Sequence, residues 1–552
     1  MEYAVVPTGP DFSPTMPNLV RFAAREYGSR EFLISRDQRV SFADAERQSG
    51  TIARILLGLG TGKGSRVGLL LPNCVDWVLY FLGIARSGAH CVALSTFYKA
   101  REMEWALRFN DVECLILSRS YLKNDYIEYL ERAIPELQTA TTPVLYLKSH
   151  PFLRRIIVLG ECDRPWAMSA MPDIQQVLAD SRLVDPSFLE EVEKQICPAD
   201  TLITINTSGS TAEPKAVVHN HGAVIRATHS FVDYIDISRE DRSYTGQPLF
   251  WVGGLNMSLL PSMHVGAAMC FAESPSPSSV VETLGRERVT RVSLWPSQAN
   301  AVRAHAQDKG VDLSSVRLGL GVPVDDDGRV IPADRRAGGI LGMSETFGMH
   351  SLERKTALMP IGKQGSWGRA LPGVERVIID RATGQAVQPG VRGALFVRGF
   401  TLMKGYHRKE REQVFTKDGY FDTGDTAAID ADGYLWFFGR ESEMIKTSGA
   451  NVSPGEVEGV LNSMDGVAAS FVFGLPSSTK GQRVIAVVCP SDRVVLDADT
   501  IRSGVSTELS GYKVPEVVVV MDDSEVPRAS SEKVALVQLK EKVAHLIGSE
   551  GS

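Results

Sequence analysis

The stretch Thr207-Ser-Gly-Ser-Thr-Ala-Glu-Pro-Lys-Ala-Val217 combines hydroxyl side chains, one glycine and one lysine. The residues before it, Thr201-Leu-Ile-Thr-Ile205, are apolar and β-branched in alternation, which predicts a buried strand that runs into a loop. Backbone N–H groups, hydroxyls and a lysine in such a loop are suitable donors for a phosphate group. A solvated surface loop has the same composition, so the stretch alone leaves both interpretations open.

The loop is not a Walker A motif. That motif requires G-x-x-x-x-G-K-[ST], whereas Lys215 lies between Pro214 and Ala216. Within the stretch, the candidate phosphate-binding groups are the hydroxyls of Ser208, Ser210 and Thr211, the backbone at Gly209 and the charge of Lys215.

Composition places the chain among ordinary globular proteins. It has 552 residues, 43% hydrophobic and 23% charged residues, and a formal net charge of −7 without a basic block, which argues against nucleic acid as a partner. Seven scattered cysteines without a C-x-x-C pair indicate reduced thiols and a cytoplasmic protein. We find no secretory signal and no apolar run of membrane-spanning length.

Helices and short apolar strands alternate in the first part of the chain. Ser41 is a candidate N-cap for a helix that starts at Phe42, and Val67–Leu71, Cys91–Ser95 and Cys114–Leu117 are expected strands separated by helices. This alternation predicts a parallel, doubly wound α/β region. A second α/β region follows the loop at Thr207, with an expected helix over 221–234 and an expected strand over 289–296.

The pattern of residues changes twice towards the C-terminus. From about Val374 to Gly399, β-branched residues between glycines and prolines indicate a small antiparallel sheet or barrel. After a charged junction near Arg440, a compact α+β unit is expected, with helices from Pro454 and from Leu496 and strands at 468–473, 484–489 and 517–521. The expected fold is therefore two doubly wound α/β subdomains and a small β-barrel, followed by a small α+β domain.

Six further motifs follow the loop in the sequence. They are Gly342-Met-Ser-Glu-Thr346, Asp418-Gly-Tyr-Phe-Asp-Thr-Gly-Asp425, Gly439-Arg440 with Ile445-Lys-Thr-Ser-Gly449, Val452-Ser-Pro-Gly-Glu-Val-Glu458, Tyr512-Lys-Val-Pro515 and Pro527-Arg-Ala-Ser-Ser-Glu-Lys533. Together they resemble the adenylate-forming (AMP-binding) superfamily, in its acyl-CoA synthetase branch, over about residues 20 to 540.

The resemblance implies a two-step reaction and its cofactors. A carboxylate attacks the α-phosphate of MgATP to give an acyl-adenylate and pyrophosphate, and the thiol of coenzyme A then takes the acyl group. It also implies an N-terminal AMP-binding domain over residues 1–440, with the ATP and acyl sites, and a mobile C-terminal domain over 441–552 that carries Lys533. Alignment and charge neutralisation are the main tasks of a protein in phosphate chemistry of this kind.

The resemblance assigns a role to each matching residue. Thr207 through Lys215 would hold the β- and γ-phosphates, Ser344 the α-phosphate, and Glu345 the Mg²⁺ ion, a cation that prefers oxygen ligands. Gly321, Val322 and Pro323 would pack against adenine, and Asp425 would accept hydrogen bonds from the ribose hydroxyls with help from Arg440. Lys533 would bridge the carboxylate and the α-phosphate, and Gly449 would line the path of the thiol.

Some positions depart from the pattern of this superfamily. Its glycines are replaced by Ala212, Ala216 and Glu532, its adenine-stacking aromatic by Leu341, and its hinge residue by Ser442. A side chain at a position that needs positive φ would cost about 1–2 kcal/mol. None of these departures removes a charged catalytic group. We therefore expect them to affect loop mobility, nucleotide affinity and domain rotation more than the chemistry.

The acyl site is expected between Trp251 with Gly253, Trp295, and Gly348 with Met349. The segment Pro248-Leu-Phe-Trp-Val-Gly-Gly254 has no carboxylate that could pair with an ammonium group, which favours an uncharged fatty or cyclic acid. Two alternatives remain: a stand-alone ligase that loads a carrier protein, and a weakly active nucleotide-binding homologue. The sequence is compatible with a homodimer and does not give the oligomeric state.

Overall fold

The computed structural model describes residues 9–169, 185–207, 214–320, 329, 331–332, 335, 339–354, 356–440, 444–491, 494–528 and 534–549. The chain divides into two compact units. The first comprises Met1–Thr96, Ala106–Asn206 and Ala216–Gly439, and the second comprises Phe97–Trp105, Thr207–Lys215 and Arg440–Ser552.

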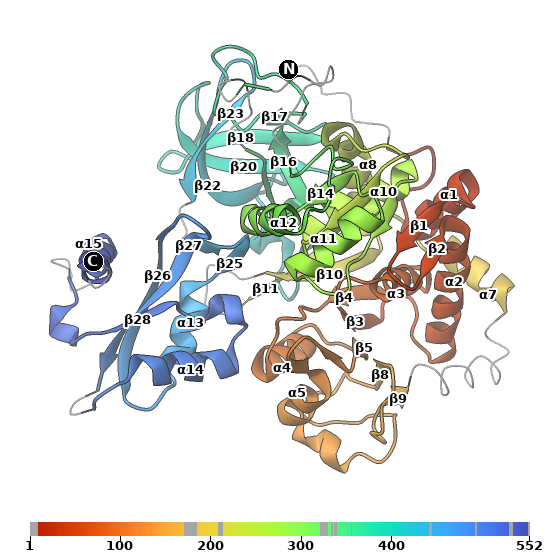
Figure 1. The fold of residues 1–552 in the computed structure, drawn as a ribbon, viewed down its shortest axis with the longest axis horizontal. Coiled ribbons are helices and arrows are strands. Elements are labelled where there is room, and N and C mark those ends of the chain that lie inside the picture. Colours follow the sequence, from red (N-terminus) through yellow and green to blue (C-terminus); the bar gives the residue numbers. More distant parts are fainter. Residues whose placement is uncertain are drawn as a thin grey trace. The chain divides into compact units, whose positions relative to one another are not determined.

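The largest sheet has eight strands in the order β21-β11-β10-β4-β3-β5-β8-β9 (Figure 1). Their bounds are β21 Gly405–Tyr406, β11 Lys215–Asn220, β10 Thr201–Thr207, β4 His90–Ala93, β3 Arg66–Leu70, β5 Cys114–Ser118, β8 Arg155–Leu159 and β9 Met168–Ser169. The strands from β10 to β9 pair in parallel, and β21 pairs with β11 in antiparallel fashion. The predicted strands at 67–71, 91–95 and 114–117 are confirmed.

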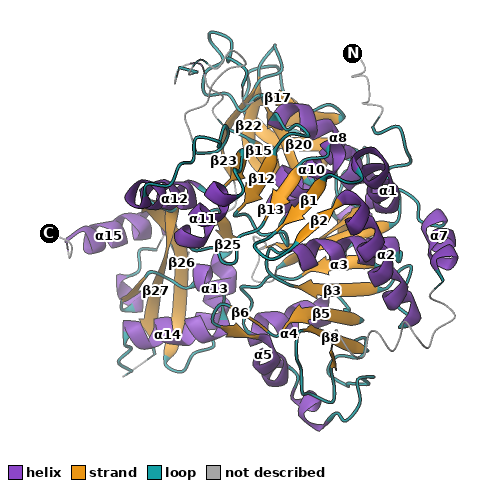
Figure 2. Ribbon diagram, turned by 45° about the vertical axis from the view of Figure 1, so that its right-hand side comes forward, coloured by secondary structure: helices purple, strands orange, loops and turns teal. Residues whose placement is uncertain are grey.

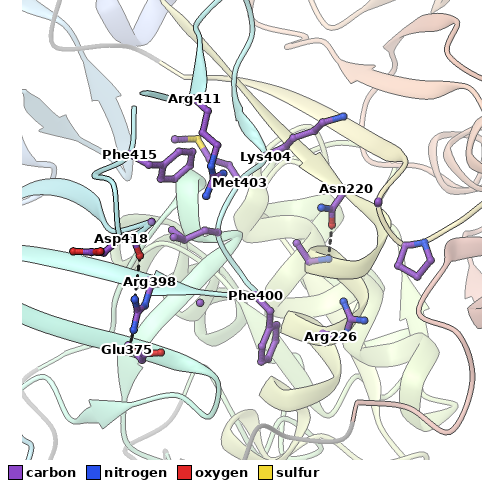
Figure 3. Close-up of a pocket in the computed structure, with 16 residues that line it drawn as sticks. Asn220, Arg226, Glu375, Arg398, Phe400, Met403, Lys404, Arg411, Phe415 and Asp418 are labelled. Carbon is purple, nitrogen blue, oxygen red and sulfur yellow. Dashed lines mark hydrogen bonds and ion pairs between the residues drawn. The ribbon is translucent and has the colours of Figure 1, made fainter. Parts of the chain in front are cut away.

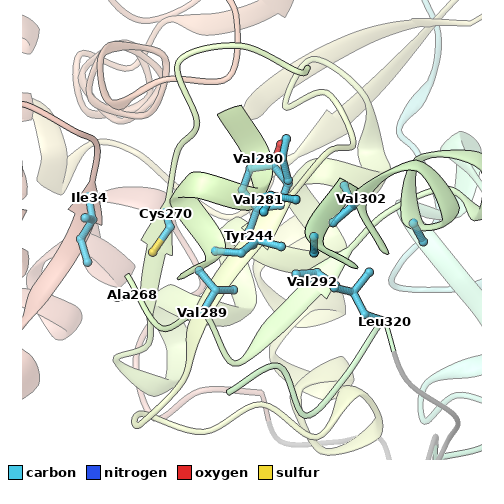
Figure 4. Packing of buried hydrophobic residues seen from close by; sticks show 13 residues of the cluster. Ile34, Tyr244, Ala268, Cys270, Val280, Val281, Val289, Val292, Val302 and Leu320 are labelled. Carbon is cyan, nitrogen blue, oxygen red and sulfur yellow. The ribbon is translucent and has the colours of Figure 1, made fainter. Parts of the chain in front are cut away.

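A second sheet has five strands in the order β14-β12-β13-β1-β2. These are β14 Arg291–Ser293, β12 Arg242–Thr245, β13 Ala268–Cys270, β1 Glu31–Ile34 and β2 Arg39–Ser41, and only β2 is antiparallel to its neighbour. One face packs against apolar residues of the helices α11 Pro277–Arg286 and α12 Pro296–Lys309. Figure 4 shows this core, in which Tyr244 lies among Val280, Val281 and Val292.

Helices alternate with the strands of both sheets (Figure 2). Their bounds are α1 Met16–Tyr27, α2 Phe42–Gly58, α3 Val75–Arg86, α4 Ala100–Phe109, α5 Tyr126–Ala133, α7 Pro186–Lys194, α8 His221–Ile235 and α10 Leu260–Val265. Ser41 caps α2 as predicted, because its hydroxyl accepts a hydrogen bond from the Asp44 N–H at 3.1 Å. Helix α1 packs against α2, α3, α8 and α10, so these helices form one layer.

The predicted antiparallel region forms a five-stranded sheet in the order β19-β18-β20-β22-β23. Its strands are β19 Gln385–Ala386, β18 Val374–Asp380, β20 Gly393–Gly399, β22 Phe421–Ile429 and β23 Leu435–Arg440. A smaller antiparallel sheet of β15 Leu341–Met343, β16 Gly348–Leu352 and β17 Arg369–Ala370 precedes it in the chain. The predicted fold class, two α/β subdomains followed by a smaller α+β region, is confirmed, and the region predicted as a small β-barrel forms this five-stranded antiparallel sheet.

The second unit contains the sheet β25-β24-β27-β26, with β28 beside β27. The strands are β24 Ile445–Thr447, β25 Ala450–Val452, β26 Val467–Ser477, β27 Gly481–Pro490 and β28 Val517–Val520, and the helices are α13 Pro454–Leu461, α14 Ala498–Glu508 and α15 Leu536–Ser549. Alternate residues of β27 enter two cores. Val484, Ala486 and Val488 pack with α13 and α14, and Ile485, Val487 and Cys489 pack with α15, as the two-residue period of a strand requires.

A buried ionic cluster also belongs to the second unit. The Nζ of Lys513 lies 2.7 Å from Oε1 of Glu102 and 2.8 Å from Oε1 of Glu456, and these three side chains are at most 10% exposed. The Ser510 hydroxyl donates to Glu102 at 2.8 Å, and the Lys99 N–H donates to it at 2.9 Å. Glu102 therefore has several partners, as a buried carboxylate requires.

Two further observations concern the chain as a whole. Helices of the described part are all too short or too polar to span a bilayer. All seven cysteines are free thiols.

Candidate active site

The segment around Glu345 is a tight connection between β15 and β16. Ser344–Thr346 forms a single 3-10 turn, and Phe347 and Gly348 follow with φ of +49° and +113°. The Thr346 hydroxyl donates to the Gly348 carbonyl at 2.6 Å and stabilises the turn. A Cβ atom at Gly348 would lie 2.7 Å from the amide of Asn256, so the glycine is required both by its φ and by this close approach.

Three other elements bind the backbone of this segment. The carbonyl of Ser344 lies 2.7 Å from Nε2 of His219 on β11, and the Glu345 carbonyl accepts from the Met403 N–H at 2.8 Å. Asn256 donates through its amide to the Phe347 carbonyl at 2.7 Å. Asn256 lies in a π-helical turn, Leu255–Leu259, a type of turn that is frequent at functional sites. The carbonyl groups of Ser344, Glu345 and Phe347 are therefore fixed from different directions.

The side chain of Glu345 is half-buried and has one partner in the described part of the chain. Its Oε1 accepts a hydrogen bond from the Tyr406 hydroxyl at 2.7 Å. Because a carboxylate has two oxygens and about four acceptor positions, Oε2 retains its full capacity to accept or to coordinate. Glu345 is thus a positioned anion with spare ligand capacity.

His219 supports this segment as a neutral imidazole. Its ring is fully buried, and burial lowers the pKa of His219 to about 4. A carbonyl oxygen only accepts, so Nε2 carries the proton and donates to Ser344, while Nδ1 has no partner among the described residues. The ring also meets the Phe347 ring edge-on, with centroids 5.0 Å apart.

Asp425 lies in a bulge of β22. Ala394 pairs with Thr426 and Phe396 pairs with Asp422, so β22 accommodates two residues more than β20 in this interval. Gly424 has φ of +72°, and the Thr423 hydroxyl donates to the Leu395 carbonyl at 2.8 Å. Because a bulge redirects the side chains of its strand, this geometry explains a carboxylate that is only 3% exposed at Asp425.

The opening stretch of the sequence connects two neighbouring strands. Thr207 ends β10 and Lys215 begins β11, while Ser208, Gly209, Ser210 and Thr211 lie outside the described residues, as does Ala212. Ala216 is buried in β11 without a positive φ, so its methyl group replaces a glycine there without backbone strain. Leu341 is also buried and packs with Val217 and Leu395.

The segment with Trp251 and Gly253 is a compact turn. Trp251 precedes the short helix α9, Val252–Gly254, and its ring contacts Phe250 edge-on at 5.6 Å. A Cβ atom at Gly253 would lie 1.9 Å from the amide oxygen of Gln247, so a larger residue would displace that side chain.

The remaining candidate residues of the acyl site belong to adjacent segments of the first unit. The Gln247 amide donates to the Ser293 hydroxyl at 3.1 Å, which joins the Trp251 turn to the strand that precedes Trp295. Gly348 contacts Asn256, three residues after Gly253. Met349 packs on an apolar cluster that includes Met257. The structure therefore links these segments through Gln247 and Asn256.

In the second unit, Gly449 lies at the tip of the β24–β25 hairpin. Ser448 and Gly449 form its two-residue loop with φ of +48° and +83°, as a type I′ turn requires. Gly449 is exposed. Arg440 ends β23, but its side chain is not described. Lys533, Glu532, Ser442, Gly321, Val322 and Pro323 lie outside the described residues.

Several residues of this site are not evident from the sequence alone. They are His219, Asn256, Tyr406, Met403 and Gln247. For His219 the sequence does contain a signal of a functional role, because this polar residue follows the apolar run Ala216-Val-Val. The others are held by contacts between residues far apart in the chain, which no local pattern contains.

Two family descriptions match the chain. AMP-binding enzyme matches residues 20–407, and AMP-binding enzyme C-terminal domain matches residues 456–533. The chain therefore belongs to the AMP-binding enzyme family, which confirms the resemblance drawn from the motifs and the expectation of an enzyme.

Known relatives agree with this assignment, and a solved structure has a similar fold. An indoleacetate–CoA ligase of Aromatoleum aromaticum is 32% identical over 358 residues, which cover 64% of this chain and 69% of that protein. A feruloyl-CoA synthase of an Amycolatopsis species is 29% identical over 502 residues, with 90% and 92% covered. The o-succinylbenzoate CoA synthetase of Bacillus subtilis has a similar fold, with a TM-score of 0.74, 24% identity, and 95% and 98% of the two chains covered.

Proposed function

We propose that this protein is an ATP-dependent acyl-CoA synthetase. In the first step a substrate carboxylate oxygen attacks the α-phosphorus of ATP, the bond to the β-phosphate oxygen breaks, and pyrophosphate leaves. In the second step the sulfur of coenzyme A attacks the acyl carbonyl, its proton is lost, and AMP leaves with the bridging oxygen. The family match and the names of the relatives support this reaction.

The observation that carries the proposal is the fixed position of Glu345. Its backbone is held by Met403, its carboxylate by Tyr406, and the preceding carbonyl by His219. A preorganised group of this kind favours charge development in a transition state, because it needs no reorganisation during the reaction. We assign Glu345 to the metal and Ser344 to the α-phosphate.

The residues present fit Mg²⁺ bound together with ATP. Mg²⁺ usually takes one or two carboxylates and completes its shell with phosphate oxygens and water. Oε2 of Glu345 is suited to be that carboxylate ligand, and the described residues contain no cluster of three or more acidic, histidine or cysteine side chains that would suit an all-protein metal cage. When bound, the ion would neutralise phosphate charge.

The other assignments rest on the motifs that the chain shares with its family. The buried carboxylate of Asp425 would accept hydrogen bonds from the ribose, aided by Arg440, and Thr207 through Lys215 would hold the terminal phosphates. Gly321, Val322 and Pro323 would pack against adenine. Lys533 would hold the two reacting anions together, and the exposed turn at Gly449 would border the path of the thiol.

We infer that the acid is uncharged beyond its carboxylate and cyclic in its acyl part. The segment from Gln247 to Gly254 has no carboxylate for a cationic group, which favours an apolar acid. Between fatty and cyclic acids, the named relatives favour the latter, because their substrates by name are indoleacetate and ferulate. Trp251, Gly253, Trp295, Gly348 and Met349 are the proposed pocket residues. The free cysteines are consistent with a cytoplasmic protein.

Pyrophosphate release over a panel of carboxylic acids tests this function. We expect release with ATP, Mg²⁺ and aromatic acids, and acyl-thioester formation only when coenzyme A is added. Lys533→Ala should slow adenylation by about 100-fold or more, as removal of a preorganised charge does. Lys480→Ala, which removes an exposed lysine paired with Glu516, is the matched control and should leave the rate unchanged.

Two outcomes would reject parts of this proposal. If no acid supports release, the protein is a nucleotide-binding homologue without synthetase activity. If release occurs and a carrier protein accepts the acyl group in preference to coenzyme A, the protein is a carrier-loading ligase.

A further inference from the structure

A cavity of about 690 Å³ lies in the first unit; its lining includes Met403, whose N–H supports Glu345, but none of the residues assigned above to a substrate or to the metal. Its walls are the start of α8, the residues before β10, the end of β20 with the segment that follows it, and the region 411–419 (Figure 3). This volume is in the range of cavities that bind small molecules.

Four basic side chains line the cavity: Arg226, Arg398, Lys404 and Arg411. Two of them converge, because a Cβ atom at Gly419 would lie 3.7 Å from Nη2 of Arg411 and 3.9 Å from Cδ of Arg398. Figure 3 shows Arg411 and Phe415 close together, and the Arg411 guanidinium lies 4.6 Å from the Phe415 ring centre. Arg411 is thus oriented by an aromatic contact and retains its N–H donors.

Acidic groups in the cavity neutralise only part of this charge. Arg398 forms an ion pair with Glu375, and its other branch donates to the Asp418 carbonyl at 3.0 Å. Within the described structure, Arg226, Lys404 and Arg411 have no carboxylate within ion-pair distance, and Asp418 is the one other acidic residue in the lining. The cavity therefore has an excess of positive charge.

The start of α8 contributes little direct hydrogen bonding to a ligand. The N–H groups of its first turn are already bonded: His221 to the Asp200 carbonyl at 3.0 Å, Gly222 to the Pro198 carbonyl at 2.8 Å, and Ala223 to the Asn220 side chain at 2.7 Å. Recognition would depend on the guanidinium and ammonium groups, with a smaller contribution from the helix dipole.

The cavity is distinct from the stretch Thr207 to Lys215, which we assign to the terminal phosphates and which ends at the first residue of β11. That strand runs from Lys215 to Asn220, and only Asn220 lines the cavity. Five steps of about 3.3 Å place the two residues about 17 Å apart. A ligand in the cavity therefore occupies the opposite end of this strand from Lys215.

The cavity wall is connected to Glu345 by backbone hydrogen bonds. Met403 and Lys404 line the cavity; the Met403 N–H donates to the Glu345 carbonyl at 2.8 Å and the Lys404 N–H to the Val218 carbonyl at 2.7 Å. Two residues further on, Tyr406 bonds the Glu345 carboxylate. A ligand that orders residues 398–404 would therefore stabilise the elements that hold Glu345.

We propose that this cavity is a second anion site, which binds the phosphate or pyrophosphate group of a small molecule and stabilises the segment that holds Glu345. Guanidinium groups suit phosphate oxygens through their planar pairs of donors. The anion would be either free inorganic phosphate or pyrophosphate, or the phosphate groups of a nucleotide. The proposal does not depend on the acyl-CoA synthetase activity.

Hydrogen exchange of the full-length protein tests the site, because it locates protection along the chain. We would compare exchange with inorganic phosphate, pyrophosphate or adenosine 3′,5′-bisphosphate against sodium chloride of equal ionic strength. We expect slower exchange in peptides that cover 398–406 and 220–226. The probe that slows exchange most shows whether the bound phosphate group belongs to an inorganic anion or to a nucleotide.

Matched double variants decide whether the basic side chains are responsible. Arg226→Ala/Arg411→Ala should weaken binding about 10-fold or more, about 1.4 kcal/mol or more. Lys123→Ala/Lys309→Ala removes the same charge from exposed positions of the first unit and should change affinity less than 2-fold, as is usual for distant, screened charges. Lys404→Ala alone provides a second test if the double variant does not fold.

The proposal is overturned by any of three results. These are no protection with any probe, protection confined to peptides around 207–215, or protection at 398–406 that persists unchanged in Arg226→Ala/Arg411→Ala or, where that variant does not fold, in Lys404→Ala.

Discussion

Glu345 in the first unit and the pair Glu102 and Glu456 in the second are carboxylates in opposite situations. Glu102 and Glu456 are buried and both pair with Lys513, so they share one counter-charge within the protein. Glu345 is half-buried, and its hydrogen-bond partner in the described structure, the Tyr406 hydroxyl, is neutral. Charge that is neutralised internally contributes to structure, whereas charge that is held in place by neutral groups is available to a ligand.

Removing Lys513 should have the largest effect. Lys513→Ala leaves two carboxylates buried without a counter-charge, which costs about 3–5 kcal/mol for a buried pair. We expect a clear fall in the thermal-unfolding midpoint and faster hydrogen exchange in the second unit. Lys480→Ala, whose ion pair with Glu516 is about 40% exposed on each side, should cost less than about 1 kcal/mol.

A double variant sharpens this test. Glu102→Gln in the Lys513→Ala background removes one of the uncompensated charges, so part of the lost stability should return. If Lys513→Ala unfolds at the wild-type midpoint, the cluster is not the structural element that we describe.

Removing the charge of Glu345 should affect activity instead of stability. In Glu345→Gln, the amide oxygen still accepts from Tyr406, but the negative charge is lost. We expect acid-dependent pyrophosphate release to fall by about 100- to 1,000-fold, equivalent to about 2.7–4 kcal/mol. The unfolding midpoint should stay near that of the wild type. Glu353→Gln, which alters a carboxylate paired with Arg369 in the same unit, is the control. An active Glu345→Gln would contradict the assigned role.

Acid should destabilise the first unit, because it contains buried histidines that are neutral in the folded state. Burial lowers the pKa of His219 and His221 to about 4. Burial also lowers the pKa of His90 and His264 to about 3, assisted by Arg66 at His90 and by His229 at His264. Below pH 6.5 the unfolded chain protonates these residues while the folded chain does not. The stability that they confer is therefore fully present above pH 6.5 and is lost as the pH falls towards 4, at up to about 1.4 kcal/mol per pH unit for each histidine.

Unfolding midpoints between pH 4.5 and 7.5 check this dependence. His219→Gln keeps a donor for the Ser344 carbonyl and removes the titrating group, so its midpoint should fall less steeply with acid. His545→Gln, at an exposed position, should follow the wild type. Equal slopes for the wild type and His219→Gln would contradict a buried neutral His219.

The smallest effect is expected from Tyr406→Phe. This variant removes a single neutral hydrogen bond to Glu345, which is worth about 1 kcal/mol, or about 5-fold in the rate of adenylation. We expect the change in kcat, with less change in the KM for ATP, because Tyr406 acts on the reaction through its hydrogen bond to Glu345. Tyr420→Phe, whose hydroxyl lies 3.3 Å from Glu375, should leave kcat unchanged. An unaltered kcat in Tyr406→Phe would show that Glu345 needs no such support.

Much of the fold was predictable from local patterns. The cap at Ser41 and the apolar strands at Val67, Cys114 and Val484 all depend on neighbours in sequence, and the structure confirms them. The family was predictable as well, because its motifs keep their order along the chain. The roles of Lys533 and of Ser208 to Thr211 stay predictions, since these residues are not described.

The sequence by itself determined the secondary structure, the family and the identity of the charged groups, including Glu345 and Asp425. Only the tertiary structure decided which carboxylate is available to a ligand, as Glu345 is, and which is paired with a lysine inside the protein, as Glu102 is. Lys513 meets Glu102 across 411 positions, His219 meets Ser344 across 125, and Tyr406 meets Glu345 across 61. Such pairings depend on which strands and turns pack together, so the environment of a charge follows from the folded chain, whereas the charge itself follows from the residue.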